Sequence, residues 1–158
     1  MNAVEKETRY VATLARIRSL IEGETDDIAI MATVVAELHH SLEHFDWTGF
    51  YRVTAPGLLK IGPYQGGHGC LTIPFDRGVC GKCAREVRIQ LVSDVTQVPY
   101  HIACASSTRS EIVVPVLTAA GDLRAVLDVD SDTIAAFDAI DARHLETVCD
   151  WVGAVSPG

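Results

Sequence analysis

Three cysteines in a loop-rich stretch are the residues of this sequence best suited to chemistry. Cys70, Cys80 and Cys104 lie between residues 62 and 110, where Gly, Pro and His are frequent and apolar runs are short. Long loops within one domain usually serve function. A thiol attacks as its thiolate, so its surroundings must lower its pKa or supply an acid or a base. Two or three thiols within reach of one another allow a cycle of sulfenic acid, disulfide and re-reduction.

The neighbours of these cysteines favour such a cycle. Cys104 has His101 before it and Arg109 and Glu111 after it, so that a cation and a carboxylate could lie near its sulfur. Cys80 lies between two glycines at a predicted helix start, where backbone N–H groups favour an anion. We therefore expect thiol redox chemistry in this stretch.

Burial and zinc binding are the alternatives for the five cysteines. Free cysteine is among the most buried residue types, and Cys149, amid apolar residues of the last predicted helix, is the best case for simple burial. Cys80 and Cys83 form a CxxC pair, which zinc sites and thioredoxin-like redox sites both use. A zinc site would need further ligands from Cys70, His68 or Cys104. A lone CxxC is a weak signal, so we expect no metal site and no cofactor.

Composition and charge exclude several classes of function. A chain of 158 residues fits a single domain, residues 1–158, and its 48% hydrophobic and 22% charged residues are typical of a folded globular protein. The net charge of −8 argues against binding to nucleic acid or to an anionic membrane surface. No apolar run reaches the ~20 residues of a membrane helix, and the charged N-terminus does not read as a signal peptide. We expect a cytoplasmic protein whose thiols are kept reduced.

Hydrophobic periodicity predicts an α+β fold. Apolar residues at helical spacing predict helices over residues 4–21 and 27–44, and a last helix that begins near residue 137. β-forming runs around turn residues predict two hairpins, built from residues 47–53 with 58–61 and from 111–117 with 123–130. This order indicates one antiparallel sheet with helices packed on a face.

Several stretches of the chain resemble the free methionine-(R)-sulfoxide reductases. Among them are Asp46-Trp47-Thr48-Gly49-Phe50-Tyr51, Gly62-Pro63-Tyr64-Gln65-Gly66, Gly78-Val79-Cys80-Gly81, His101-Ile102-Ala103-Cys104, Arg109-Ser110-Glu111-Ile112-Val113-Val114-Pro115 and Leu127-Asp128-Val129-Asp130-Ser131. The similarity runs from about Tyr10 to Trp151 in the same order with no large gap. Each stretch alone is weak evidence for this family, whereas their combination is highly specific for it.

The resemblance implies a fold, an activity and partners. These enzymes are GAF domains, with a central antiparallel sheet flanked by helices and a covered pocket. They reduce the R-sulfoxide of free methionine, with thioredoxin as the usual electron donor, and the resemblance also implies a homodimer. Carried over to this chain, Cys104 is the nucleophile, Cys70 the thiol that resolves its sulfenic acid, and Cys80 an alternative resolving or relay thiol.

The resemblance also assigns the acidic and aromatic residues of the pocket. Glu111, Asp128 and Asp130 match its carboxylates, and Trp47 and Tyr51 match its aromatic wall. One carboxyl group with a raised pKa would protonate the sulfoxide oxygen, while the others bind the ammonium group of a free amino acid. The aromatic rings would hold the S-methyl group. The two aspartates are two residues apart on a predicted strand, so they share one face of the sheet.

The chain departs from the family pattern at three places. Ala105 follows the nucleophile where the family often has Asp, His68 and Gly69 precede Cys70, and Cys83 is an additional thiol. We expect Gly69 to make Cys70 mobile, and Cys83 could form an off-pathway disulfide or serve as a fourth relay thiol. The alternative function is a non-catalytic GAF domain that senses a small molecule in the same pocket.

Overall fold

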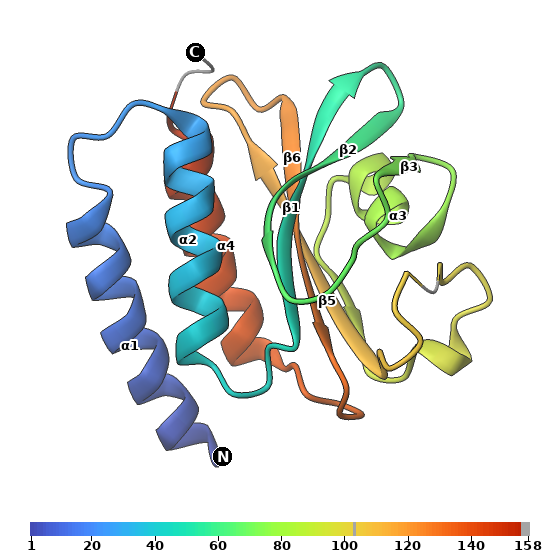
Figure 1. Ribbon diagram of the computed structural model, residues 1–158, viewed down its shortest axis with the longest axis horizontal. Coiled ribbons are helices and arrows are strands. Elements are labelled where there is room, and N and C mark those ends of the chain that lie inside the picture. Colours follow the sequence, from blue (N-terminus) through green and yellow to red (C-terminus); the bar gives the residue numbers. More distant parts are fainter. Residues whose placement is uncertain (103, 156–158) are drawn as a thin grey trace.

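A six-stranded antiparallel sheet forms the centre of the molecule in the computed structural model, which describes residues 1–102 and 104–155 (Figure 1). Its strands are β1 (Trp47–Ala55), β2 (Leu58–Gln65), β3 (Thr72–Pro74), β4 (Gln90–Val92), β5 (Ser110–Leu117) and β6 (Leu123–Ser131). They are ordered β3-β2-β1-β6-β5-β4 across the sheet. The predicted α+β fold with one antiparallel sheet is confirmed. Ala103, part of the predicted motif before Cys104, lies outside the described residues.

Helices cover both faces of this sheet unequally. Three long helices, α1 (Ala3–Leu20), α2 (Asp27–Ser41) and α4 (Ala139–Gly153), form a layer on one face (Figure 1). The opposite face carries α3 (Gly78–Glu86), the short 3-10 helix η1 (Val95–Gln97) and the connecting loops. Within the described part of the chain, no helix has both the length and the apolar character needed to cross a bilayer.

The alternation of side chains along the strands gives the sheet two separate cores. On β1, Phe50 is fully buried among the residues that face the long helices. Trp47 and Tyr51, on the same strand, belong to a second cluster on the side of α3. Successive side chains of a strand point to opposite faces, so one strand serves both layers.

The structure corrects some of the predicted element boundaries. The helix predicted over residues 27–44 ends at Ser41, because Leu42 adopts an extended backbone conformation. The stretch between residues 62 and 110, predicted as loops around short apolar pieces, contains β3, α3 and β4. Both predicted hairpins are confirmed. Cys149 is 1% exposed in the helical core, which confirms simple burial for this thiol.

A buried carboxylate ties the helical layer together. Asp141, near the start of α4, is fully buried and accepts hydrogen bonds from Lys6 Nζ (2.6 Å), Tyr10 Oη (2.6 Å) and His44 Nε2 (2.7 Å). These donors come from α1 and from the segment that follows α2. Hydrogen bonds from His44, Lys6 and Tyr10 outweigh the cost of burial and hold the pKa of Asp141 below its ordinary value.

Removing the charge of Asp141 should destabilise the fold, because Lys6 would lose its buried partner. We expect Asp141→Asn to lower the free energy of unfolding by about 3 kcal/mol. A depressed carboxylate pKa contributes stability that is present above the unfolded-state pKa and is lost as the pH falls below about 4. Urea titrations between pH 2 and 7 should show a shallower acid loss in Asp141→Asn than in the wild type. Asp150→Asn, an exposed position on the same helix, is the control, and equal behaviour of the two variants would contradict this role for Asp141.

Candidate active site

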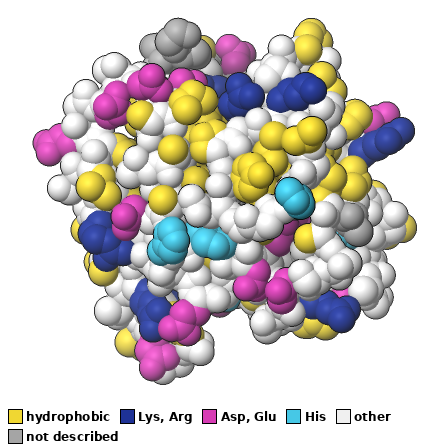
Figure 2. Space-filling model, viewed as in Figure 1, with side chains coloured by type: hydrophobic (Ala, Val, Ile, Leu, Met, Phe, Trp, Pro, Cys, Tyr) yellow, Lys and Arg dark blue, Asp and Glu magenta, His cyan; other side chains and the backbone are white. Residues whose placement is uncertain are grey.

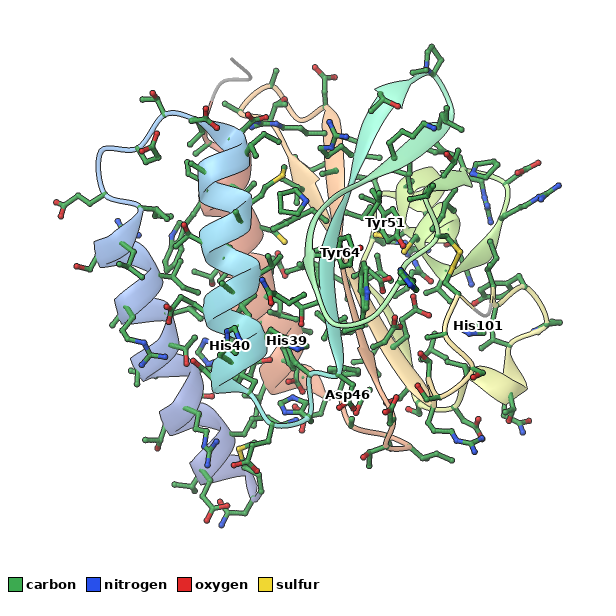
Figure 3. The ribbon with its side chains drawn as sticks, in the orientation of Figure 1. His39, His40, Asp46, Tyr51, Tyr64 and His101 are labelled. Carbon is green, nitrogen blue, oxygen red and sulfur yellow. A yellow bond between two sulfur atoms is a disulfide. The ribbon has the colours of Figure 1, made fainter. Side chains whose placement is uncertain are left out.

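A pocket lies on the sheet face opposite the three long helices, where α3 and the loops approach β1, β5 and β6. All the predicted site residues except Cys70 line it: Trp47, Tyr51, Cys80, Cys104, Glu111, Asp128 and Asp130. Cys70 is bonded to one of them, Cys104. Tyr51 and His101 point toward this region from β1 and from the loop before β5 (Figure 3).

The register of the strands gathers three carboxyl groups on the pocket face. Asp130 of β6 lies opposite Trp47 of β1 on one side and opposite Glu111 of β5 on the other. Asp128 is two residues earlier on β6 and therefore faces the same way. The prediction that the two aspartates share one face of the sheet is confirmed.

A disulfide between Cys70 and Cys104 lies beside this pocket. The two residues are 34 positions apart in the sequence, and their Cα atoms are 5.4 Å apart. Cys70 lies two residues before the edge strand β3, and Cys104 lies in the loop that leads to β5. Both residues are partly exposed.

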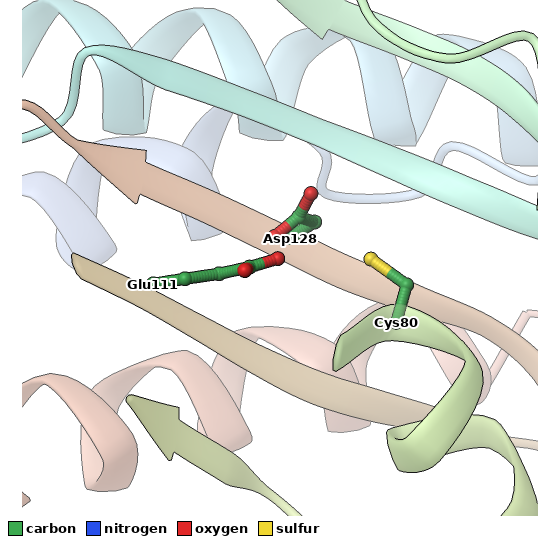
Figure 4. Close-up of side chains that lie close together, drawn as sticks. All are labelled: Cys80, Glu111 and Asp128. Atoms are coloured by element: carbon green, nitrogen blue, oxygen red, sulfur yellow. The ribbon is translucent and has the colours of Figure 1, made fainter. Parts of the chain in front are cut away.

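Two of the carboxyl groups are buried without a countercharge. Glu111 and Asp128 are each 5% exposed, and one oxygen of each lies within 4.8 Å of the other (Figure 4). Burial, then the charge of Asp130, raises the pKa of Glu111 to about 8. Burial and the neighbouring Glu111 raise the pKa of Asp128 well above its ordinary value. The pair therefore keeps a proton at neutral pH.

Asp130 adds a third carboxyl group at the edge of this pair. Burial, then the charges of Asp128 and Asp132, raises its pKa well above the ordinary value. One oxygen each of Glu111 and Asp128 (Oε2 and Oδ1) is buried without a hydrogen-bond partner in the described structure. Buried polar atoms without partners are costly, so these atoms are free to bind a ligand that offers N–H or O–H groups.

The thiol of Cys80 belongs to the carboxyl cluster. Its sulfur and one oxygen each of Glu111 and Asp128 lie within 4.8 Å of one another (Figure 4). The sequence predicted an anion here because Cys80 lies at a helix start. That prediction is wrong, because burial and the charges of Asp128 and Glu111 raise the pKa of Cys80 well above its ordinary value. These donor atoms could coordinate a metal ion only after the ion displaced the protons that burial holds on them.

Cys83 is kept away from the pocket. It is fully buried on the inner side of α3, with its Sγ 3.8 Å from the carbonyl oxygen of Val113. Burial, then the charge of Asp128, raises the pKa of this thiol well above its ordinary value. A buried thiol with a raised pKa is a poor nucleophile, so the predicted relay role for Cys83 has no support in this arrangement.

Stacked aromatic rings form one wall of the pocket. Trp47 lies between Tyr51 and Tyr64, with ring centroids 5.8 and 5.4 Å away and interplanar angles of 24° and 19°. Its indole Nε1–H donates to the carbonyl oxygen of Gly67 (3.0 Å). Tyr64, half-exposed on β2 (Figure 3), extends the wall toward solvent, and its role was not predicted from the sequence.

Two glycines make room for the Trp47 ring. A Cβ atom on Gly49 would lie 2.4 Å from the ring and 2.6 Å from Cβ of Tyr64, and one on Gly69 would lie 2.7 Å from the same ring. Gly69 was expected to make Cys70 mobile. The structure supports a different reason for this glycine, the close approach of the chain to the aromatic wall.

The sequence did not predict the contact between His101 and Glu111, and it wrongly placed Arg109 near the pocket. His101 Nδ1 lies 3.4 Å from Oε2 of Glu111, with 14% of the His101 side chain exposed. Arg109 was expected to supply a cation near Cys104, but it is exposed and does not line the pocket. His101 was considered only as a possible cation near Cys104, since its contact with Glu111 depends on the path of the loop before β5.

Comparisons with known proteins agree with this fold. The family model described as GAF domain matches residues 24–155. Protein YtsP of Bacillus subtilis is 41% identical over 142 residues, which cover 89% of this chain and 86% of that protein. The free methionine-R-sulfoxide reductase of Escherichia coli is 37% identical and covers 87% of this chain and 83% of its own length. The reductase of Neisseria meningitidis, solved with its substrate, is 39% identical with a TM-score of 0.89, over 97% of this chain and 91% of that one.

This protein is therefore a GAF domain whose pocket carries thiol and carboxyl groups. The extent of the matches shows more than the fold, because they span most of each chain at 32–39% identity. The chain belongs to the free methionine-R-sulfoxide reductase family of GAF domains.

Substituting Gly49 should displace the aromatic wall. In Gly49→Ala the new methyl group overlaps the Trp47 ring, so we expect a loss of stability of about 1–3 kcal/mol and a shift of Trp47 fluorescence toward that of an exposed indole. Trp47→Phe in the same background separates this signal from that of Trp151. Gly67→Ala, where a Cβ meets no atom within 4 Å, is the control. An unchanged emission spectrum in Gly49→Ala would contradict the packing described.

Proposed function

We propose that this protein reduces free methionine-(R)-sulfoxide to methionine with Cys104 as the nucleophile. The observation that carries the proposal is the Cys70–Cys104 disulfide beside a pocket with a proton-holding carboxyl pair. The reductases of Escherichia coli and Neisseria meningitidis, similar over nearly the whole chain, support the same activity.

The first step is the transfer of oxygen from the substrate to Cys104. The sulfur of Cys104 attacks the sulfoxide, the S–O bond of the substrate breaks, and Cys104 becomes a sulfenic acid while methionine leaves. The oxygen must gain a proton as this bond breaks, and the Glu111–Asp128 pair can supply one because it is still protonated at neutral pH.

The pocket also accounts for selectivity toward the free amino acid. The unpaired oxygen of Asp128, together with Asp130, would bind an ammonium group, which a residue within a peptide lacks. Trp47 and Tyr51 offer the apolar surface that the S-methyl group requires.

The second half of the cycle returns the enzyme to its reduced state. The thiol of Cys70 attacks the Cys104 sulfenic acid, releasing water and forming the disulfide. A dithiol protein such as thioredoxin then reduces the disulfide by thiol–disulfide exchange. Cys80 remains the alternative resolving thiol, and the predicted cytoplasmic location and homodimer remain predictions.

The activity can be tested with separated substrate epimers. We expect thioredoxin-dependent oxidation of NADPH with the free R epimer and not with the S epimer or with peptide-bound sulfoxide. Cys104→Ser should abolish turnover, whereas Cys149→Ser, altered in the helical core, is the matched control. Absence of turnover on the R epimer would contradict the proposal. Binding without turnover, undiminished in Cys104→Ser, would instead support a sensor.

The pH dependence of turnover should report the carboxyl pair. The proton donor must be protonated, and burial raises the pKa of Glu111 to about 8, so kcat should fall as the pH rises above this value. Glu111→Gln removes the donor and should lower kcat by roughly 10²–10⁴-fold. A variant that keeps the wild-type rate and the same alkaline limb would contradict the assignment of Glu111.

A further inference from the structure

His101 is a titratable group in the pocket that no step described so far employs. Its Nδ1 atom lies 3.4 Å from Oε2 of Glu111, and in the described structure neither atom has a hydrogen-bond partner. The side chain is 14% exposed, against 6% for Glu111. The imidazole therefore lies beside Glu111 of the buried carboxyl pair and is the more exposed of the two side chains.

The loop that carries His101 also carries Cys104. The backbone N–H of His101 donates to the carbonyl oxygen of Val98 (3.2 Å), and that of Cys104 donates to Ile102 (3.0 Å). Ile102, between them, packs against the backbone of Gly78 at the start of α3, where an added Cβ would lie 3.0 Å from its side chain. These contacts hold the loop in place, and His101 and Cys104 both line the pocket.

We propose that His101 carries the thiol proton of Cys104 to Glu111 during reduction of the substrate. The thiol must lose a proton to become a nucleophile, and the sulfoxide oxygen must gain one. Nε2 of the neutral imidazole takes the proton from Cys104. Glu111 gives its own proton to the oxygen, and the N–H at Nδ1 then reprotonates Glu111. No proton is gained or lost overall, because the thiol passes one proton to Nε2, Nδ1 passes one to Glu111, and Glu111 passes one to the oxygen of the sulfenic acid.

The surroundings of His101 suit this role. The titratable groups that line the same pocket come from every element around it: Tyr51, His68, Cys80, Cys104, Glu111, Asp128 and Asp130. None of them is a permanent cation, and burial lowers the pKa of His101 below its ordinary value, so the imidazole is neutral and able to accept a proton at pH 7. The 3.4 Å separation is long for a hydrogen bond, but such contacts commonly shorten when substrate binds.

The inference rests on the proposed reductase activity and is tested by His101→Gln. We expect kcat to fall about 100-fold with KM changed less than about twofold, because the imidazole acts on a proton and not on substrate binding. In the wild type, kcat should decline at acid pH as His101 becomes charged. The variant should lose this acid limb and keep the decline above about pH 8, where Glu111 loses its proton. His40→Gln, an exposed histidine on α2 (Figure 3), should match the wild type.

The possible outcomes distinguish a failure of the His101 relay from a failure of the proposed reductase activity. If the wild type turns over and His101→Gln keeps its kcat, or loses rate with the acid limb in place, the relay is wrong while the reductase stands. If the wild type does not turn over, the proposed function itself fails. Should His101→Gln not fold, ¹⁵N NMR of the wild type decides. The chemical shifts of the His101 ring should change as Glu111 ionises, and this change should be absent in Glu111→Gln. If the wild type does not show it, the relay is wrong.

Discussion

The shared proton of Glu111 and Asp128 is the interaction on which the site depends. Two carboxyl groups this close and this buried cannot both be charged, so one proton stays with them at neutral pH. The sheet makes the arrangement possible, because β5 and β6 present both side chains on the face that the long helices leave open. A proton held on buried carboxyl groups is what the reduction of a sulfoxide requires.

The pKa values of buried carboxyl groups are shifted in opposite directions on the two faces of the sheet. On the helical face, Asp141 has Lys6, Tyr10 and His44 as donors, and its pKa is lowered. On the pocket face, Glu111 and Asp128 have no cation as a hydrogen-bond partner, and their pKa values are raised. The first arrangement stabilises the fold, while the second leaves polar atoms unpaired for a ligand. Buried carboxyl groups are structural or reactive according to the hydrogen-bond donors around them.

Charged side chains of both signs are interspersed over the visible described surface (Figure 2).

Local patterns were sufficient to predict the scaffold, while contacts distant in sequence were not predictable. Helical and strand periodicity predicted the long helices and the two hairpins that carry Trp47, Glu111 and Asp128. For α3 the sequence predicted only a helix start near Cys80, because its nine residues contain two glycines and two cysteines. The end of α2 was also missed, since Leu42 is apolar but leaves the helix to begin the connection to β1.

The site residues were found largely through resemblance to a family, and their electrostatics only through the structure. The helix start at Cys80 suggested a stabilised thiolate, whereas burial beside two acids raises its pKa. The Glu111–His101 contact depends on a loop whose path the sequence does not specify. The requirement for glycine at positions 49 and 69 follows only from the structure, in which the Trp47 ring lies against both residues.

Direct titration of Glu111 tests the central claim of a proton held on the carboxyl pair. Carboxyl ¹³C chemical shifts of selectively labelled protein, followed from pH 3 to 10, report the ionisation of each side chain. We expect Glu111 to titrate near pH 8 and Asp128→Asn to alter this value, since the two side chains titrate together. A Glu111 carboxyl that ionises near its ordinary value of 4.5, unaffected by Asp128→Asn, would contradict it.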